Sequence, residues 1–146
     1  MIKAWFDGVC EPKNPGGFAA YGIHVEVDGA VVARRGAYVG NGPLYSNNVA
    51  EYSGFIAAAK ECLNHEGPIE IRGDSALVIN QLRGKWRVNG GLYYPYYVEA
   101  SDLWAMLRER GQLFWIPRQE NEICDVLSKQ VLKDMGVKFR IQREDA

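Results

Sequence analysis

The chain has 146 residues, a length that suits one ordinary domain whose core needs no disulfide or structural metal. Hydrophobic residues make up 47% and charged residues 24%, which excludes a disordered chain or a fibrous repeat. The formal net charge of -1 gives little general attraction to phosphate, so binding of nucleic acid would require the basic residues to be grouped apart from the acids. We therefore expect a single domain over residues 1–146.

Membrane, export and disulfide features are absent from the sequence pattern. The longest apolar run, Phe55 to Ala59, is too short for a membrane span. Asp7 interrupts the N-terminal segment before a signal-peptide core could form, so we expect a cytoplasmic protein with no membrane partner. Cys10, Cys62 and Cys124 have no zinc-ligand spacing and are typical of intracellular thiols. Whether Cys62 forms a disulfide stays open.

The first forty residues predict three strands, over Met1 to Cys10, Phe18 to Val27 and Ala30 to Val39. Asn14-Pro15-Gly16-Gly17 forces a loop after the first strand. Asp28-Gly29 is the signature of a two-residue hairpin, which makes the second and third strands antiparallel neighbours.

From Asn47 onward, apolar residues recur at three- and four-residue intervals, which predicts an amphipathic helix that ends near Gly67. Asn47 or Asn48 is its expected N-cap. Two elements are expected next, a strand over Ile69 to Arg72 and a helix over Ala76 to Leu82 capped by Asp74-Ser75. They are followed by a helix over Tyr94 to Arg110 and a strand over Leu113 to Ile116. The last expected element is a helix capped by Asn121 that reaches about Met135. Residues 137–146 form either an edge segment or a flexible tail. This order predicts an α/β fold with a mixed sheet and helices on its faces.

Four carboxylates lie at positions where a charged side chain calls for an explanation. Asp7 interrupts an apolar strand, and Glu51 shares a helix face with Phe55, so it points toward protein. Asp74 follows the fourth strand, and Asp125 lies in the first turn of the last helix. Each alone has an ordinary explanation, as a strand end, a favourable partner of a helix dipole or an N-cap. Together, the acids of separate elements would form a site for Mg²⁺ or Mn²⁺.

Four motifs stand in a fixed order along the chain. They are Asp7-Gly8-Val9-Cys10 followed by Asn14-Pro15-Gly16, then Asn47-Asn48-Val49-Ala50-Glu51-Tyr52, then Gly73-Asp74-Ser75, and then Glu120-Asn121-Glu122-Ile123-Cys124-Asp125. Over residues 1 to about 135, the chain resembles type 1 ribonuclease H in these motifs. The resemblance implies a ribonuclease H-like fold, with a five-stranded mixed sheet of order 3-2-1-4-5 and helices on both faces. It also implies an endonuclease that cuts the RNA strand of RNA/DNA hybrids.

The resemblance further implies a metal site and a substrate surface. Two Mg²⁺ or Mn²⁺ ions would be held by the four acids, one to activate a water and one to stabilise the leaving 3′-oxygen. Cys10, Asn14, Asn47 and Asn48 match family positions that contact the minor groove and both backbones of the hybrid. A monomer is expected, and double-stranded RNA stays open as a second partner.

Two departures from the family concern basic residues. The long basic insertion of many bacterial members is absent, and a short stretch with Arg83, Lys85, Trp86 and Arg87 is the candidate for holding the DNA backbone, or else a solvated loop. The histidine loop before the last acidic helix is replaced by Pro117-Arg118-Gln119. Arg118 is the hypothesised catalytic substitute; the alternative is an exposed ion pair with a neighbouring glutamate.

Three rival interpretations remain at this stage. Another nuclease of the same superfamily, an exonuclease or a recombination enzyme, would share the sheet and the acids. A non-catalytic nucleic-acid-binding domain would have lost activity, although four intact acids argue against that. The last rival is a generic α/β domain whose four acids are unrelated caps.

Overall fold

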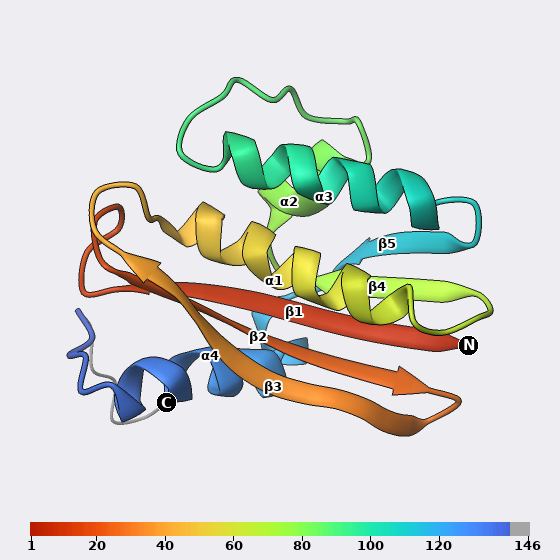
Figure 1. Cartoon of the computed structure of the whole chain (residues 1–146), viewed down its shortest axis with the longest axis horizontal. Helices are drawn as coiled ribbons and strands as arrows, with labels where there is room; N and C mark the ends of the chain where they lie inside the picture. The colour runs from red at the N-terminus through yellow and green to blue at the C-terminus, as the bar shows by residue number, and fades with distance from the viewer. Residues whose placement is uncertain (141–146) are drawn as a thin grey trace.

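The computed structural model describes residues 1–140 as one five-stranded sheet with helices on both faces (Figure 1). The strands lie in the order β3-β2-β1-β4-β5, as predicted. β2 is antiparallel to both β1 and β3, whereas β4 is parallel to β1 and β5. The strands are β1 (Ile2–Glu11), β2 (Phe18–Val27), β3 (Ala30–Asn41), β4 (Ile69–Gly73) and β5 (Gly111–Trp115).

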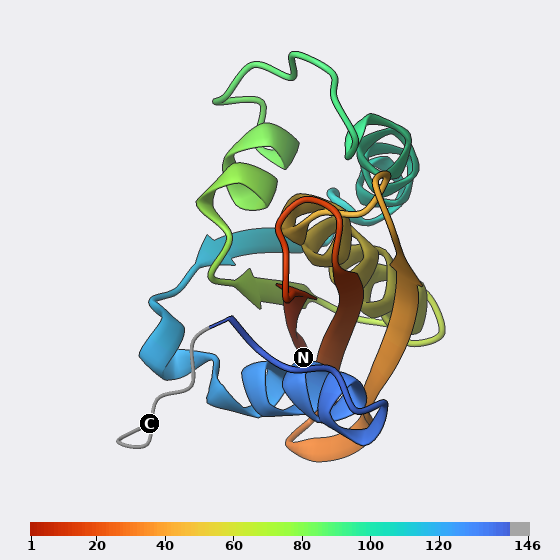
Figure 2. The same cartoon turned by 90° about the vertical axis from the view of Figure 1, so that its left-hand side faces the viewer.

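The helices divide unequally between the two faces. α1, α2 and α3 cover one face, and α4 lies alone on the other (Figure 2). Their bounds are α1 (Asn47–Cys62), α2 (Ala76–Leu82), α3 (Tyr94–Leu107) and α4 (Glu122–Asp134), with a short 3-10 helix η1 (Arg118–Glu120) before α4. The predicted α/β fold is therefore confirmed. α3 ends three residues earlier than expected because the chain turns back at Arg110, whose N–H donates to the carbonyl of Leu107, and enters β5.

The β2–β3 hairpin confirms the turn chemistry of the sequence. Asp28 and Gly29 both adopt positive φ values, of 50° and 84°. Val27 pairs directly with Ala30 across this two-residue turn. An aspartate and a glycine are among the residues that accept this left-handed backbone most readily, so the hairpin register follows from these two positions.

The start of α1 corrects one prediction. Its N-cap is Ser46, whose hydroxyl accepts the N–H of Val49 at 3.2 Å, and not Asn47 or Asn48. The side chain of Asn14 supplies a second acceptor, because its Oδ1 receives the N–H of Asn47 at 2.8 Å. The loop after β1 is thereby joined to the first turn of α1.

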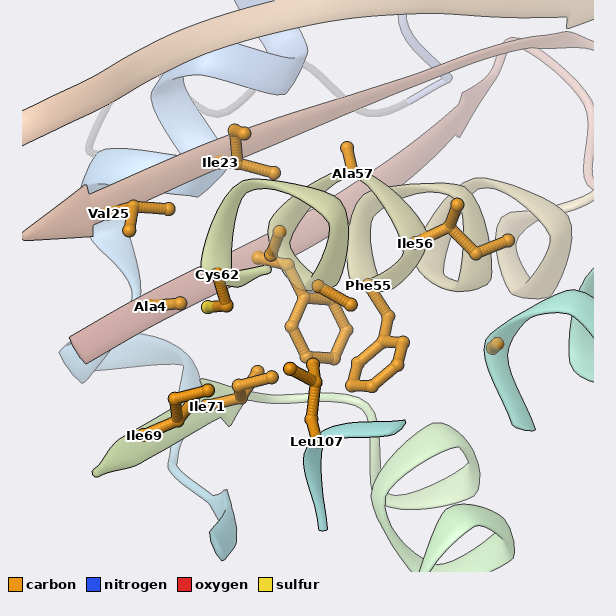
Figure 3. Packing of buried hydrophobic residues seen from close by; sticks show 14 of the residues in the cluster. Ala4, Ile23, Val25, Phe55, Ile56, Ala57, Cys62, Ile69, Ile71 and Leu107 are labelled. Carbon is orange, nitrogen blue, oxygen red and sulfur yellow. The ribbon is translucent and has the colours of Figure 1, made fainter. Parts of the chain in front are cut away.

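The main core lies between the sheet and α1 (Figure 3). Ala4, Ile23 and Ile71 project from three neighbouring strands toward Phe55 and other residues of α1. α3 covers the outer side of α1, which explains why α1 is buried on most of its surface instead of along one stripe. α1 is consequently fixed in position, and with it any side chain at its N-terminal end.

The chain after α4 folds back without forming a strand. Val137 and Phe139 pack on a small cluster of Val9, Ala20 and Leu132, and Arg140 bonds to Glu11 at the end of β1. Residues 137–140 thus form a packed segment without strand pairing, and residues 141–146 lie outside the described part of the chain. Within residues 1–140, no helix is long and apolar enough to cross a membrane. All three cysteines, Cys62 included, are buried free thiols.

Candidate metal centre

The candidate site begins where β1 and α1 touch. A Cβ atom on Gly8 would overlap the backbone of Ala50 and Glu51, so only glycine permits this approach. The contact brings Glu51, one turn into α1, beside Asp7 on β1. Both carboxylates are buried, with 5% of each residue exposed, which confirms that Glu51 points into the protein.

Asp74 completes a cluster of three acids. One carboxylate oxygen each from Asp7, Glu51 and Asp74 lie within 4.8 Å of one another. Asp74 reaches the cluster from the turn that follows β4, which pairs with β1 in parallel, so the two strand ends present their acids at the same edge. Glu51 Oε1 and Asp74 Oδ2 are buried without any hydrogen-bond partner in the described residues.

The electrostatics of the three acids favour protons or a cation. Burial, followed by the charges of Asp74 and Asp125, raises the pKa of Asp7 to about 8, although the N–H of Gly8 opposes the rise. Burial, reinforced by the charges of Asp7 and Asp74, places the pKa of Glu51 well above its usual range. Burial also raises the pKa of Asp74, against the opposing effects of Asp7, the Arg118 charge and the Asn121 amide. Ionised together, these groups repel one another.

The donor set fits a hard divalent cation. Carboxylate oxygens are the preferred ligands of Mg²⁺ and Mn²⁺, and two of the three acids carry buried oxygens that no group of residues 1–140 satisfies. A bound cation would neutralise the repulsion that raises these pKa values. Asp7, Glu51 and Asp74 are therefore the residues that can hold such an ion.

Asp125 lies near the cluster but is not one of the three acids whose oxygens lie within 4.8 Å of one another. Its Oδ2 accepts a hydrogen bond from Lys129 Nζ at 3.1 Å, one turn further along α4. α4 can lie close to β2 because Gly22 has no side chain. A Cβ atom there would lie 2.5 Å from the carbonyl oxygen of Cys124. The charge of Asp125 reaches Asp7 and raises its pKa. The structure thus gathers three of the four predicted acids and sets the fourth beside them.

The predicted substrate residues around α1 differ in accessibility. Cys10 is buried and its thiol donates to the carbonyl of Lys13 at 3.1 Å, so its side chain does not face solvent as a substrate contact would require. Asn14 is exposed, and Asn47 and Asn48 are half-buried in the first turn of α1. These three asparagines remain candidates for contact with a ligand.

The basic segment after α2 is only partly available. Arg83 is exposed, but its Nη2 donates to the carbonyl of Leu113 on β5, so part of its guanidinium is already engaged within the protein. Lys85, Trp86 and Arg87 are exposed. Their backbone is held in place, because Gln81 Nε2 donates to the carbonyl of Arg87 at 3.1 Å.

Arg118 lies in η1 beside the acids, and its charge lowers the pKa of Asp74 against the effect of burial. Its side chain takes part in none of the ion pairs between residues 1 and 140, so the alternative pairing with Glu120 or Glu122 does not form. Two residues that the sequence analysis did not assign to the site also support it. The indole N–H of Trp115 donates to the carbonyl of Asp74 at 3.1 Å. Asn121, which was predicted only as a helix cap, donates to the carbonyl of Phe6 beside Asp7.

The raised pKa of Asp7 predicts how stability depends on pH. Between about pH 3.8 and about pH 8, Asp7 stays protonated in the folded, metal-free protein, whereas in the unfolded chain it has lost its proton. The free energy of unfolding should therefore fall as pH rises through this window, by up to about 1.4 kcal/mol per pH unit for one such group. Thermal unfolding in EDTA at pH 5 and pH 8 measures the effect.

Two controls accompany this pH prediction. Asp7→Asn should flatten the decline, and Mg²⁺ at pH 8 should restore stability because it binds the folded state. Equal stability of the metal-free wild type at both pH values would contradict the electrostatic description of the cluster.

Comparison with known proteins assigns the chain to a family. The family described as reverse transcriptase-like matches residues 6–131. The curated ribonuclease HI of Halobacterium salinarum is 35% identical over 134 residues, 91% of this chain, and this match spans 65% of the relative's length. A curated bifunctional protein of Mycobacterium tuberculosis is 35% identical over 89 residues, 24% of its length. The chain thus spans less than two thirds of these curated relatives.

Solved structures agree with the sequence comparison. The crystal structure of RNase H1 from H. salinarum has a TM-score of 0.79 and 34% identity, covering 91% of this chain and 98% of that one. The N-terminal RNase H domain of the M. tuberculosis protein gives 0.78 and 30%, covering 88% and 96%. LC11-RNase H1, solved with an RNA/DNA hybrid, has a TM-score of 0.80 at 22% identity, covering 92% of this chain and 99% of that one. At this identity the likeness supports the fold alone. The chain belongs to the reverse transcriptase-like family and, within it, to the type 1 ribonuclease H group.

Proposed function

We propose that this chain is an endoribonuclease that hydrolyses the RNA strand of RNA/DNA hybrids, using divalent metal ions held by Asp7, Glu51 and Asp74 with Asp125 as a fourth ligand. One observation carries the proposal: two buried carboxylates and the partly buried Asp74, from separate elements, bring their oxygens within 4.8 Å of one another. Such an arrangement costs stability unless cations are bound there. The name of the H. salinarum relative, ribonuclease HI, supports the reaction class.

The chain's own residues would prepare the reaction around the ions. Divalent cations at a carboxylate site supply activation of water and stabilisation of the leaving 3′-oxygen, here with two ions as the family implies. Asp7, Glu51 and Asp74 fix where the scissile phosphate must lie. Arg118 stands at the edge of the cluster, where its guanidinium can hold a phosphate oxygen.

The proposed hybrid surface is largely uncharged. Asn14 and the first turn of α1 form one continuous surface, because Asn14 Oδ1 accepts the N–H of Asn47 at 2.8 Å. Amide groups can bind sugar hydroxyls and bases in a minor groove without a net charge, which agrees with recognition of shape and of the 2′-hydroxyl. Lys85, Trp86 and Arg87 would contact the DNA backbone from the exposed loop after α2.

A cleavage assay on three duplexes tests the proposed function. RNA/DNA hybrid, double-stranded RNA and double-stranded DNA of one sequence are incubated with the protein, with and without Mg²⁺. The expected result is Mg²⁺-dependent cleavage of the RNA strand of the hybrid and none of double-stranded DNA. No cleavage of the hybrid would contradict the proposal, and cleavage of double-stranded RNA would widen the substrate class.

A closed circular hybrid separates endonuclease from exonuclease action. An endonuclease cuts the circle, whereas an exonuclease requires an end. Failure to cut the circle, together with activity on the linear hybrid, would favour the exonuclease interpretation.

Replacing Lys85 and Arg87 together with alanine should raise KM for the hybrid about three- to tenfold and leave kcat within about twofold. These exposed cations lie on the loop after α2, and contacts remote from the cut stabilise the ground state and the transition state alike. Steady-state kinetics on a labelled hybrid measures both constants. Arg83 is left intact because its guanidinium bonds to the carbonyl of Leu113.

The matched control for this pair replaces Lys3 and Arg108, two exposed cations at the opposite end of the sheet. An unchanged KM in the Lys85/Arg87 variant, or an equal change in the control, would show that the segment is only a solvated loop.

A further inference from the structure

Asn121 occupies the junction between the acid-bearing elements. The residue is 2% exposed, and its Nδ2 donates to the carbonyl of Phe6 at 2.8 Å in a buried hydrogen bond. Phe6 immediately precedes Asp7 on β1, so this bond ties the start of α4 to the strand that carries the first acid. The two residues are 115 positions apart in the sequence.

The backbone of the same residue joins two more groups of the site. Its carbonyl accepts the N–H of Asp125 at 3.1 Å, and its N–H donates to the carbonyl of Arg118 at 3.0 Å. Its amide also lies close enough to Asp74 to favour the ionised carboxylate. One buried residue thus connects Asp7, Asp74, Asp125 and Arg118, which three separate stretches of the chain supply.

The side chain of Asn121 bonds to Phe6 instead of capping α4. Asn121 stands at the N-cap of α4, where an asparagine normally accepts an N–H of the first turn, yet it makes no cap hydrogen bond. With Nδ2 directed at Phe6, its Oδ1 is buried and has no hydrogen-bond partner among residues 1–140. A helix without its cap bond and an unsatisfied buried oxygen both disfavour the folded state, so this orientation calls for a reason other than stability.

We infer that Asn121 is a positioning residue, whose bond to the Phe6 carbonyl holds β1 and α4 in the register that metal binding requires. The inference rests on the proposed function, because the register matters through the ions that the acids hold. Groups that orient metal ligands without touching the metal typically change metal affinity or activity 10- to 100-fold when removed. Asn121 occupies such a place for Asp7 and Asp74.

The substitution Asn121→Ser separates positioning from stability. Serine caps helices about as well as asparagine, so α4 can gain the cap bond that it now lacks, while the shorter side chain cannot reach Phe6. Asn80→Ser is the matched control, because Asn80 also donates from Nδ2 to a backbone carbonyl, that of Ala76 at 2.9 Å, but within its own helix. Calorimetric titration with Mn²⁺ and steady-state cleavage of a hybrid are measured on all three proteins, with thermal unfolding to confirm folding.

For Asn121→Ser, we expect the Kd for Mn²⁺ to rise about tenfold, kcat to fall about 10- to 100-fold, and KM for the hybrid to stay within about threefold. Asn80→Ser should match the wild type. A folded Asn121→Ser with unchanged Kd and kcat, or equal losses in Asn80→Ser, would overturn the inference. If the wild type binds Mn²⁺ but cuts no hybrid, the proposed function fails, while the Mn²⁺ affinities still decide the role of Asn121.

Discussion

Asp7→Asn should abolish Mg²⁺-dependent cleavage, with a loss of at least about 1,000-fold in the single-turnover rate, or about 4 kcal/mol. Asparagine has the shape of aspartate, so the fold stays intact while the site loses a charged ligand. In metal-free protein at pH 8 the same change should raise the melting temperature, because it removes a carboxyl group whose pKa is raised to about 8 by burial and neighbouring acids. Rate and melting temperature thus move in opposite directions.

Asp102→Asn is the matched control for Asp7→Asn, since Asp102 is an exposed acid on α3 outside the cluster. It should leave both the rate and the melting temperature unchanged. Near wild-type cleavage by Asp7→Asn in Mg²⁺ would exclude the acid cluster as the catalytic centre.

Arg118→Ala should lower kcat by roughly ten- to a thousand-fold, on the order of 1.4 to 4 kcal/mol, with little change in KM. Arg118 is exposed in η1, forms no ion pair within residues 1–140, and acts electrostatically on Asp74. Its guanidinium stays protonated, so it cannot serve as a general base, but it can stabilise charge on a phosphate. Steady-state kinetics on a labelled hybrid measures the effect.

Two further variants sharpen the Arg118 experiment. Arg118→Lys should recover only part of the loss, because a single ammonium does not reproduce two parallel hydrogen bonds. Gln119→Ala, an exposed neighbour in the same short helix, should behave like the wild type. A wild-type kcat for Arg118→Ala would show that the residue belongs to the ordinary protein surface.

The sequence predicted those features of the fold that depend on short-range chemistry. Asp28-Gly29 determined the hairpin, and the apolar spacing after Asn47 determined α1. The direction of Glu51 also followed from its helix face, because it shares that face with Phe55, which is fully buried in the core. The order of the strands came from the motif resemblance and agrees with the structure.

The errors arose where one polar side chain had several possible partners. Ser46 and Asn14 cap α1 in place of the predicted Asn47 or Asn48, because the partner of the first N–H group comes from a distant loop. Arg83 turns to the carbonyl of Leu113, thirty residues away. The side chain of Asn121 donates to the carbonyl of Phe6 and makes no cap hydrogen bond to α4. Such choices depend on tertiary contacts that no local pattern contains.

The motif order predicted four acids in one site, whereas the structure leaves Asp125 out of the group whose oxygens lie within 4.8 Å. Lys129 lies one helical turn beyond Asp125, and this spacing favours an ion pair whether or not the carboxylate has a second role. The pair is partly open to solvent and therefore weak, so a cation at the cluster can compete for Asp125 with little energetic cost.

Anomalous diffraction from crystals soaked in Mn²⁺ shows whether Asp7, Glu51 and Asp74 hold divalent ions. We predict an anomalous peak within about 2.5 Å of carboxylate oxygens of Asp7 and at least one of Glu51 and Asp74. A fully occupied second peak is expected only with substrate present. Crystals in which Mn²⁺ occupies other sites, with none beside the oxygens of Asp7, Glu51 and Asp74, would exclude these acids as a metal centre.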